Sequence, residues 1–384
     1  MQKKIITKKC VSVSQPVLGE LESKYVNNAL KDNAVSGFYG EYLSKFESGF
    51  SEYCGCRYGV STTSGTTALH LAMLTLSIGE GDEVLVSSLT NMATFFAVLY
   101  TGAKPISVDI EKDTLNIDPK LIEKKITPRT KAILVVHLFG HPVDMHPVIE
   151  IARRHNLFIV EDCAQAHGAE YKGKKVGSFG DIGCFSFYAN KILTTGEGGM
   201  IITNNSNYAE RAAVLKSLAF GDKNKFMHEA VGYNYRMTNL QAALGCAQLE
   251  RIEEIIKKKR VIANYYTERF LSNPYLQLPV EKSYAKNVYW MYFIVLKGIL
   301  NEKRKLVMSL LAERGIETRE GFIPYNMQNI FIEKGLAHFD ECPVANNVAY
   351  SGFYLPSGSN LYDEDLEYVA ENFIEIINSL ANSH

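Results

Sequence analysis

The sequence predicts an α/β fold with a mainly parallel sheet, followed by a smaller C-terminal α+β domain. Between about residues 57 and 205, short apolar runs alternate with longer helix-like segments. The apolar runs lack strict polar alternation, which is typical of strands buried on both faces. After residue 240 a long charged helical segment follows, and beyond it the regular alternation of strand and helix ends.

The first part of the chain contains four predicted strands, at residues 83–88, 105–110, 132–140 and 157–165. Helical spacing of apolar residues predicts helices in the segments between them, at residues 93–102, 119–126 and 146–156. Repeated strand–helix–strand units imply parallel strands in one sheet, with helices on both faces. Ligands of such sheets bind beyond the carboxyl ends of the strands.

The second part of the chain begins with a long charged helix, predicted as one element over residues 241–270. After it we expect a strand at 288–296, a helix that ends at Gly315 and a final helix from residue 363. The long helix is a natural bridge between two domains. We therefore divide the chain into a large domain, residues 1–250, and a smaller C-terminal domain, residues 251–384.

Composition excludes several functional classes. Lys and Arg number 41 against 42 Asp and Glu, so the net charge of −1 offers no overall attraction to nucleic acid or anionic membrane. No stretch approaches the ~20 apolar residues of a membrane span. The seven cysteines are an odd number and several lie in apolar runs, which indicates reduced thiols and a cytoplasmic protein. Cys54 and Cys56 have no second Cys/His pair at metal-site spacing, so no metal is expected.

The first candidate site is the segment TTSGTTALHLAML, residues 62–74, where small polar residues precede an apolar helix. A helix N-terminus has free backbone N–H groups and a positive partial charge, so Gly65 and Thr66 could bind a phosphate. The alternative is a simple N-cap, which the same residue types also favour.

The second candidate is the pair Glu161 and Asp162, at the end of an apolar strand. A carboxylate there is costly unless it meets a cation or a hydrogen-bond donor. For Glu161 we prefer a solvated or capping role. For Asp162 a structural and a functional role are equally open at this point.

The third candidate is Lys191, between two apolar runs in a loop rich in Ser, Thr and Gly. Partial burial lowers the pKa of a lysine and makes its amine nucleophilic, whereas a solvated lysine would have no such role. Ser186 offers a further phosphate donor nearby. A lysine, a carboxylate and a phosphate-binding helix start are together what pyridoxal 5′-phosphate (PLP) requires.

A family resemblance covers residues 12 to 380. The segments that carry it include SGTTALHLAM, VEDCAQAHGAEYKGKKVGSFGDIGCFSF, NKILTTGEGGMI and GYNYRMTNLQAALGCAQLERI. These segments resemble the nucleotide-sugar aminotransferases of the DegT/DnrJ/EryC1/StrS family, and within it the branch of the GDP-perosamine synthases. The resemblance implies an aspartate-aminotransferase-like fold of type I, in which the large domain binds PLP.

The resemblance also implies roles for individual residues. Lys191 forms the Schiff base with the cofactor and transfers protons, and Asp162 pairs with the pyridine nitrogen. Gln165 binds the phenolic oxygen. The phosphate is bound by Gly65, Thr66 and Ser186, and by Asn234 from the partner subunit of a homodimer that shares its active sites.

The activity implied is transfer of an amino group from L-glutamate to a nucleotide-linked 4-keto-6-deoxyhexose, for amino-sugar and surface polysaccharide biosynthesis. One alternative within the class is a 3-keto sugar as acceptor, which the QAHG segment suits. A second is a sugar dehydratase of the same family, but in those proteins His replaces the lysine, so Lys191 argues against it. A non-catalytic PLP-binding regulator is a third alternative. Such regulators usually carry a DNA-binding module, and this sequence shows no basic recognition helix.

Overall fold

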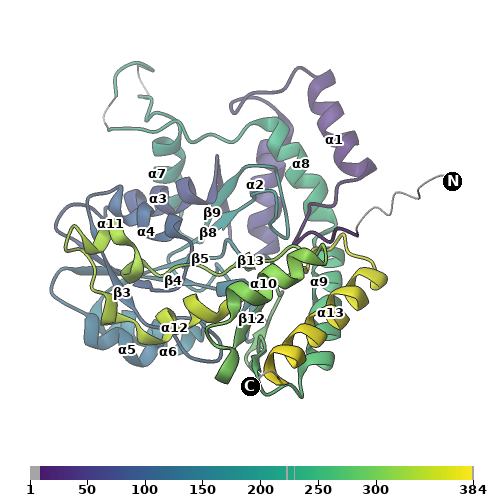
Figure 1. The fold of residues 1–384 in the computed structure, drawn as a ribbon. Coiled ribbons are helices and arrows are strands. Elements are labelled where there is room, and N and C mark those ends of the chain that lie inside the picture. The colour runs from purple at the N-terminus through teal and green to yellow at the C-terminus, as the bar shows by residue number, and fades with distance from the viewer. Residues whose placement is uncertain (1–8, 222–223, 229, 383–384) are drawn as a thin grey trace.

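The structure is a computed structural model that describes residues 9–221, 224–228 and 230–382 (Figure 1). Its centre is a seven-stranded sheet of order β1-β9-β8-β5-β4-β2-β3. The strands are β1 Tyr58–Thr62, β2 Glu83–Ser87, β3 Lys104–Val108, β4 Thr130–Val136, β5 Phe158–Asp162, β8 Ile182–Ser186 and β9 Gly199–Thr203. From β8 to β3 neighbouring strands are parallel, and β9 runs antiparallel to both of its neighbours. The prediction of a mainly parallel α/β sheet is confirmed.

Helices cover both faces of this sheet. In Figure 1, α3 and α4 lie on one side and α5 and α6 on the other. The strands between them are almost wholly buried, which explains their apolar sequences. The helices packed around the sheet are α1 Glu20–Lys31, α2 Glu41–Tyr53, α3 Gly65–Thr75, α4 Met92–Leu99, α5 Pro119–Ile122, α6 Met145–His155 and α7 Ser206–Lys216.

The prediction of one continuous helix over residues 241–270 is wrong. The structure has two helices, α8 Asn239–Glu250 and α9 Ile252–Phe270, separated by Arg251 with φ −107° and ψ 3°. The break lets α8 pack on α1 and α2 while α9 packs on α13. The guanidinium of Arg251 lies 3.0 Å from the buried carboxylate of Glu22, which ties the break to α1.

The C-terminal part contains a four-stranded antiparallel sheet of order β10-β12-β14-β13. Its strands are β10 Leu276–Gln277, β12 Tyr292–Leu296, β13 Arg319–Glu320 and β14 Gly352–Leu355. The remaining helices are α10 Arg304–Glu313, α11 Asn329–Ile332, α12 Pro343–Ser351 and α13 Asp363–Asn382. A small three-stranded sheet joins β11 Ala285–Lys286 to β6 Glu170–Tyr171 and β7 Lys174–Lys175.

The start of the described chain packs against this C-terminal part. Val11 pairs with Ile316, and the backbone oxygen of Val13 accepts a hydrogen bond from Ser357. The division of the chain near residue 250 stays a prediction, and these contacts place residues 11 and 13 beside the smaller sheet. None of the helices that the structure describes is long and apolar enough to cross a membrane.

Candidate active site

A cavity of about 400 Å³ lies at the carboxyl ends of β5 and β8 and the start of α3, which is the edge predicted for ligands. Its wall combines residues of the central sheet with residues of the smaller sheet. The predicted site residues that line it are Gly65, Thr66, Asp162, Gln165, Ser186 and Lys191. The structure thus brings together the three candidate segments that lie far apart in the sequence.

The start of α3 forms one end of this cavity. Ser64 caps the helix, and its hydroxyl accepts a hydrogen bond from the N–H of Thr67 at 3.2 Å. The N–H groups of Gly65 and Thr66 belong to the first turn of the helix, where no helical carbonyl lies one turn earlier to accept from them. They are therefore free to bind an anion. A Cβ on Gly65 would lie 2.6 Å from the Cβ of Ser186, so only glycine lets the helix approach β8 this closely. This end of the cavity therefore fits a phosphate.

Asp162 closes β5 and is 5% exposed. Its carboxylate accepts hydrogen bonds from the Thr94 hydroxyl at 2.9 Å and from the N–H of Ala164 at 3.0 Å. Burial raises the pKa of Asp162, although both hydrogen bonds and the charge of Lys191 act in the opposite direction. A carboxylate whose charge is not fully compensated, in the wall of a cavity, fits a protonated pyridine nitrogen.

Lys191 extends from the loop after β8 into the same cavity. Its Nζ lies 3.9 Å from the centre of the Trp290 ring, and the indole N–H of Trp290 donates to the backbone oxygen of Asn190 at 2.8 Å. Burial lowers the pKa of Lys191 to about 8, while the nearby charge of Asp162 acts to raise it. The amine is therefore partly unprotonated near neutral pH, as a nucleophile and proton carrier must be.

Gln165 is 3% exposed, and its orientation is set by the main chain. Its Oε1 accepts a hydrogen bond of 2.8 Å from the N–H of Phe139. Because a backbone N–H can only donate, the side-chain oxygen must face Phe139, and the Nε2 group remains available as a donor. Gln165 lines the cavity, so this donor suits the phenolic oxygen that the resemblance assigns to it.

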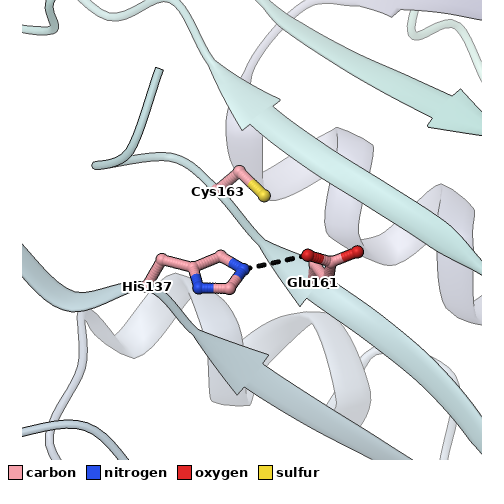
Figure 2. A group of neighbouring side chains, drawn as sticks. All are labelled: His137, Glu161 and Cys163. Atoms are coloured by element: carbon pink, nitrogen blue, oxygen red, sulfur yellow. Dashed lines mark hydrogen bonds and ion pairs between the residues drawn. The ribbon is translucent and has the colours of Figure 1, made fainter. Parts of the chain in front are cut away.

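Glu161 points to the opposite side of β5 from Asp162, into a closed polar cluster with His137 and Cys163 (Figure 2). The carboxylate is fully buried and accepts from His137 Nε2 at 3.0 Å. It also accepts from the backbone N–H groups of Gly177, Phe179 and Gly180. A solvated Glu161 is therefore wrong, and the capping role is correct.

The ligand-type atoms of this cluster lie within 4.8 Å of one another, yet hydrogen bonds use most of them. The N–H of Val143 donates to His137 Nδ1, so the proton of the imidazole is on Nε2, facing Glu161. Burial raises the pKa of the Cys163 thiol well above its ordinary value, which disfavours the thiolate that a metal binds. The chemistry favours a structural network over a metal site.

Asn234 is the one predicted site residue outside the cavity lining. It is exposed and pairs with Ser217 in an isolated antiparallel bridge. Its contact with the cofactor of a partner subunit stays a prediction.

Several cavity residues were not predicted from the sequence: Thr94, Trp290, Arg319 and Tyr354. Trp290 is the only tryptophan of the chain, which was an available signal, whereas nothing local marks Thr94.

Comparison with known proteins agrees with this geometry. Residues 16–374 match the model of the DegT/DnrJ/EryC1/StrS aminotransferase family. The chain belongs to this family. Among its relatives, the GDP-perosamine synthase of Escherichia coli O157:H7 is 42% identical over 367 residues, which is 96% of this chain and 98% of that protein. The GDP-perosamine synthase of Caulobacter vibrioides is 40% identical over 94% of this chain and 96% of its own length.

Solved structures of the DegT/DnrJ/EryC1/StrS aminotransferase family have the same fold. The PLP form of a putative sugar aminotransferase, Spr1654 from Streptococcus pneumoniae, has a TM-score of 0.92 and 26% identity, and covers 97% of this chain and 100% of that one. The chain is thus an aminotransferase, its cofactor is PLP, and the predicted fold of type I is confirmed. Membership of an aminotransferase family also favours an enzyme over a non-catalytic regulator.

Proposed function

We propose that this aminotransferase transfers the amino group of L-glutamate to C4 of a GDP-linked 4-keto-6-deoxyhexose, as a step in amino-sugar, O-antigen and lipopolysaccharide biosynthesis. The geometry that supports transamination is the single cavity that contains Lys191, Asp162 and the start of α3. The choice of nucleotide and of C4 rests on the 42% identity to a GDP-perosamine synthase over nearly the whole of both chains.

The residues of the cavity have distinct roles in this reaction. When bound, PLP supplies an aldehyde that takes up the amino group and a ring that withdraws electrons from the reacting carbon. Asp162 holds a proton on the ring nitrogen, which sustains that withdrawal. The amine of Lys191 removes a proton from the α-carbon of glutamate and delivers one to C4 of the sugar in the second half of the cycle. Trp290 holds this amine in place.

The experiment that tests the acceptor is a panel assay with L-glutamate and GDP-, UDP- and dTDP-linked 4-keto and 3-keto sugars. We expect the highest kcat/KM with the GDP-linked 4-keto sugar, and a product with nitrogen on C4. A preference for a 3-keto sugar would support the alternative that the QAHG segment suits. A 4-keto preference with another nucleotide would contradict only the GDP assignment.

We also propose a homodimer in which Asn234 of one subunit donates to the cofactor phosphate of the other. Its exposure, and its position outside the cavity of its own chain, support this arrangement. Mixing the inactive Lys191→Ala chain with an inactive Asn234→Ala chain should restore activity, because a mixed dimer has one site without either defect. Subunit exchange without recovered activity would contradict the shared site.

We place the reaction in the cytoplasm. All seven cysteines are free in the structure, and six of them are at least partly buried. Reduced cysteines in this number are typical of a reducing compartment. Fractionation of cells that express the protein at its native level would test the location, with the membrane fraction as the contrary outcome.

A further inference from the structure

His70 lies in α3, the helix whose start lines the cofactor cavity. It follows Gly65 by five residues, which corresponds to about 7.5 Å along the helix axis. The imidazole is 5% exposed, and burial lowers the pKa of His70, so the ring is neutral near pH 7. His70 is not part of the cavity lining, so it does not contact a ligand of the cavity directly.

The imidazole makes one hydrogen bond within the described part of the chain. Its Nδ1 lies 3.0 Å from the hydroxyl oxygen of Tyr235, and its Nε2 is buried without a partner. Burial raises the pKa of Tyr235, so this phenol also stays uncharged. The contact therefore joins two neutral groups. The change of Tyr235 to Phe would leave both ring nitrogens of His70 without a partner.

Tyr233 and Tyr235 form a stacked pair that packs on His70. Their ring centroids lie 5.1 Å apart with 28° between the planes, and the His70 ring lies 5.2 Å from that of Tyr233 and 6.0 Å from that of Tyr235. Successive side chains of an extended segment point to opposite sides, so the two tyrosines share the side that faces α3. Asn234 therefore points to the other side, in agreement with its exposure.

The backbone of this segment is attached to the end of α7. The N–H of Tyr233 donates to the oxygen of Leu215 at 2.7 Å, and the N–H of Tyr235 donates to the oxygen of Lys216 at 2.9 Å. Helix α7 itself packs on α3. The segment is thus joined to α3 by two routes. The backbone bonds set where the segment lies, and the contact with His70 holds its tyrosine side toward α3.

We propose that His70 is a positioning residue for the cofactor phosphate of the partner subunit, because it holds the tyrosine pair and so keeps Asn234 turned away from its own chain. The inference rests on the proposed homodimer, in which Asn234 donates to that phosphate. Each α3 then has two roles: its start binds the phosphate of its own site, and His70 orients the residue that completes the other site. A substitution of His70 should therefore affect the site of the other subunit.

The first test measures cofactor affinity in the protein without PLP, and uses pyridoxal, which lacks the phosphate, as a second probe. We expect Asn234→Ala and His70→Leu each to raise the Kd for PLP about ten-fold, and Tyr235→Phe about three- to ten-fold. The Kd for pyridoxal should change less than about two-fold. Tyr233→Phe is the matched control, because Tyr233 packs on the same imidazole but the hydroxyl that bonds it belongs to Tyr235. It should bind PLP as wild type does.

A double-mutant cycle tests whether His70 acts through Asn234. If it does, the variant with both substitutions should bind PLP at most about two-fold more weakly than Asn234→Ala alone. Independent effects would multiply, to about a hundred-fold relative to wild type. A purely structural role of His70 would contribute its full factor and would weaken the binding of pyridoxal as well.

A mixed dimer tests whether His70 acts across the interface. One chain carries Lys191→Ala and the other His70→Leu, and two different affinity tags allow the mixed dimer to be purified after co-expression. Cofactor joined covalently to Lys191 has its own absorbance, so only the site of the His70→Leu chain is observed. This site receives Asn234 from the chain in which His70 is intact. Its Kd for PLP should therefore return to within about two-fold of wild type.

The proposal is overturned if this mixed dimer keeps the raised Kd, because His70 would then act on the α3 of its own site. It is also overturned if His70→Leu and Tyr235→Phe both bind PLP normally. The mixed dimer of Lys191→Ala with Asn234→Ala is the reference. A raised Kd there would mean that the proposed shared site is wrong, and the double-mutant cycle would then decide whether His70 orients Asn234 within one chain.

Discussion

The two faces of β5 carry adjacent carboxylates in opposite situations. On one face, the Glu161 carboxylate accepts hydrogen bonds from three backbone N–H groups and from the imidazole of His137. Burial acts to raise its pKa, but these bonds outweigh burial and lower it. On the other face, Asp162 has two donors, and burial raises its pKa. The protein has thus satisfied one buried charge and left the next one incompletely satisfied.

The number of hydrogen-bond donors distinguishes the structural carboxylate from the functional one better than burial does, because both carboxylates are almost wholly buried. Glu161 holds the turn at residues 177–180 against the sheet. Asp162 faces a cavity that also contains Lys191, and we propose the protonated ring of PLP as the partner of this carboxylate.

The largest effect is expected for Lys191→Ala, which should abolish turnover while the fold is retained, because Lys191 is the one lysine that lines the cavity among the residues that the structure describes. Borohydride reduction of the loaded enzyme followed by peptide mapping should place the cofactor on Lys191. Lys259 is the natural comparison, because burial lowers its pKa to about 7 but it lies outside the cavity lining. Label on Lys259, or activity of Lys191→Ala above background in a glutamate assay, would contradict the assignment.

Asp162→Asn should lower kcat about a thousand-fold or more, because an amide cannot hold the proton on the ring nitrogen. In the protein without cofactor, we expect the same substitution to increase stability although it lowers kcat. The raised pKa of Asp162 means that its charged form destabilises the fold at neutral pH, so the variant should have a higher Tm there. Asp181→Asn, outside the cavity lining, is the control for kcat. A normal kcat for Asp162→Asn would exclude the role.

Glu161→Gln should lower the free energy of unfolding by about 3 kcal/mol. An amide cannot accept hydrogen bonds from His137 and all three backbone N–H groups, so some of these buried donors are left without a partner. The activity per folded molecule should change much less than in Asp162→Asn. Urea denaturation measures the first quantity and active-site titration the second. Glu150→Gln, which breaks an exposed contact with His146, should change stability by less than about 0.5 kcal/mol.

The smallest effect is expected in how the Tm difference between wild type and Glu161→Gln changes at acid pH. The folded pKa of Glu161 lies below its ordinary value of 4.5, so its contribution to stability is present above pH 4.5 and is lost as pH falls below it. The Tm difference between wild type and Glu161→Gln should therefore narrow as the pH is lowered below 4.5. A difference that stayed constant to pH 3 would mean that charge is not what Glu161 contributes.

Local patterns were sufficient for four of the seven strands of the central sheet. The four predicted strands correspond to β2, β3, β4 and β5, and the predicted helices between them to α4, α5 and α6. Periodicity and capping residues act over a few positions, so they can be read without knowledge of the rest of the chain. The break at Arg251 could not be predicted in this way, because its cause is the packing of α8 and α9 on different neighbours.

For the site, the sequence by itself determined which residue types could carry the chemistry: a lysine in a polar loop, a carboxylate ending an apolar strand, and a glycine at a helix start. Only the tertiary structure decided that Thr94 bonds Asp162 from 68 residues away, that Trp290 holds Lys191, and that Arg319 faces Tyr354 across two short strands. These pairs depend on packing between distant segments, and no local rule of periodicity contains that information.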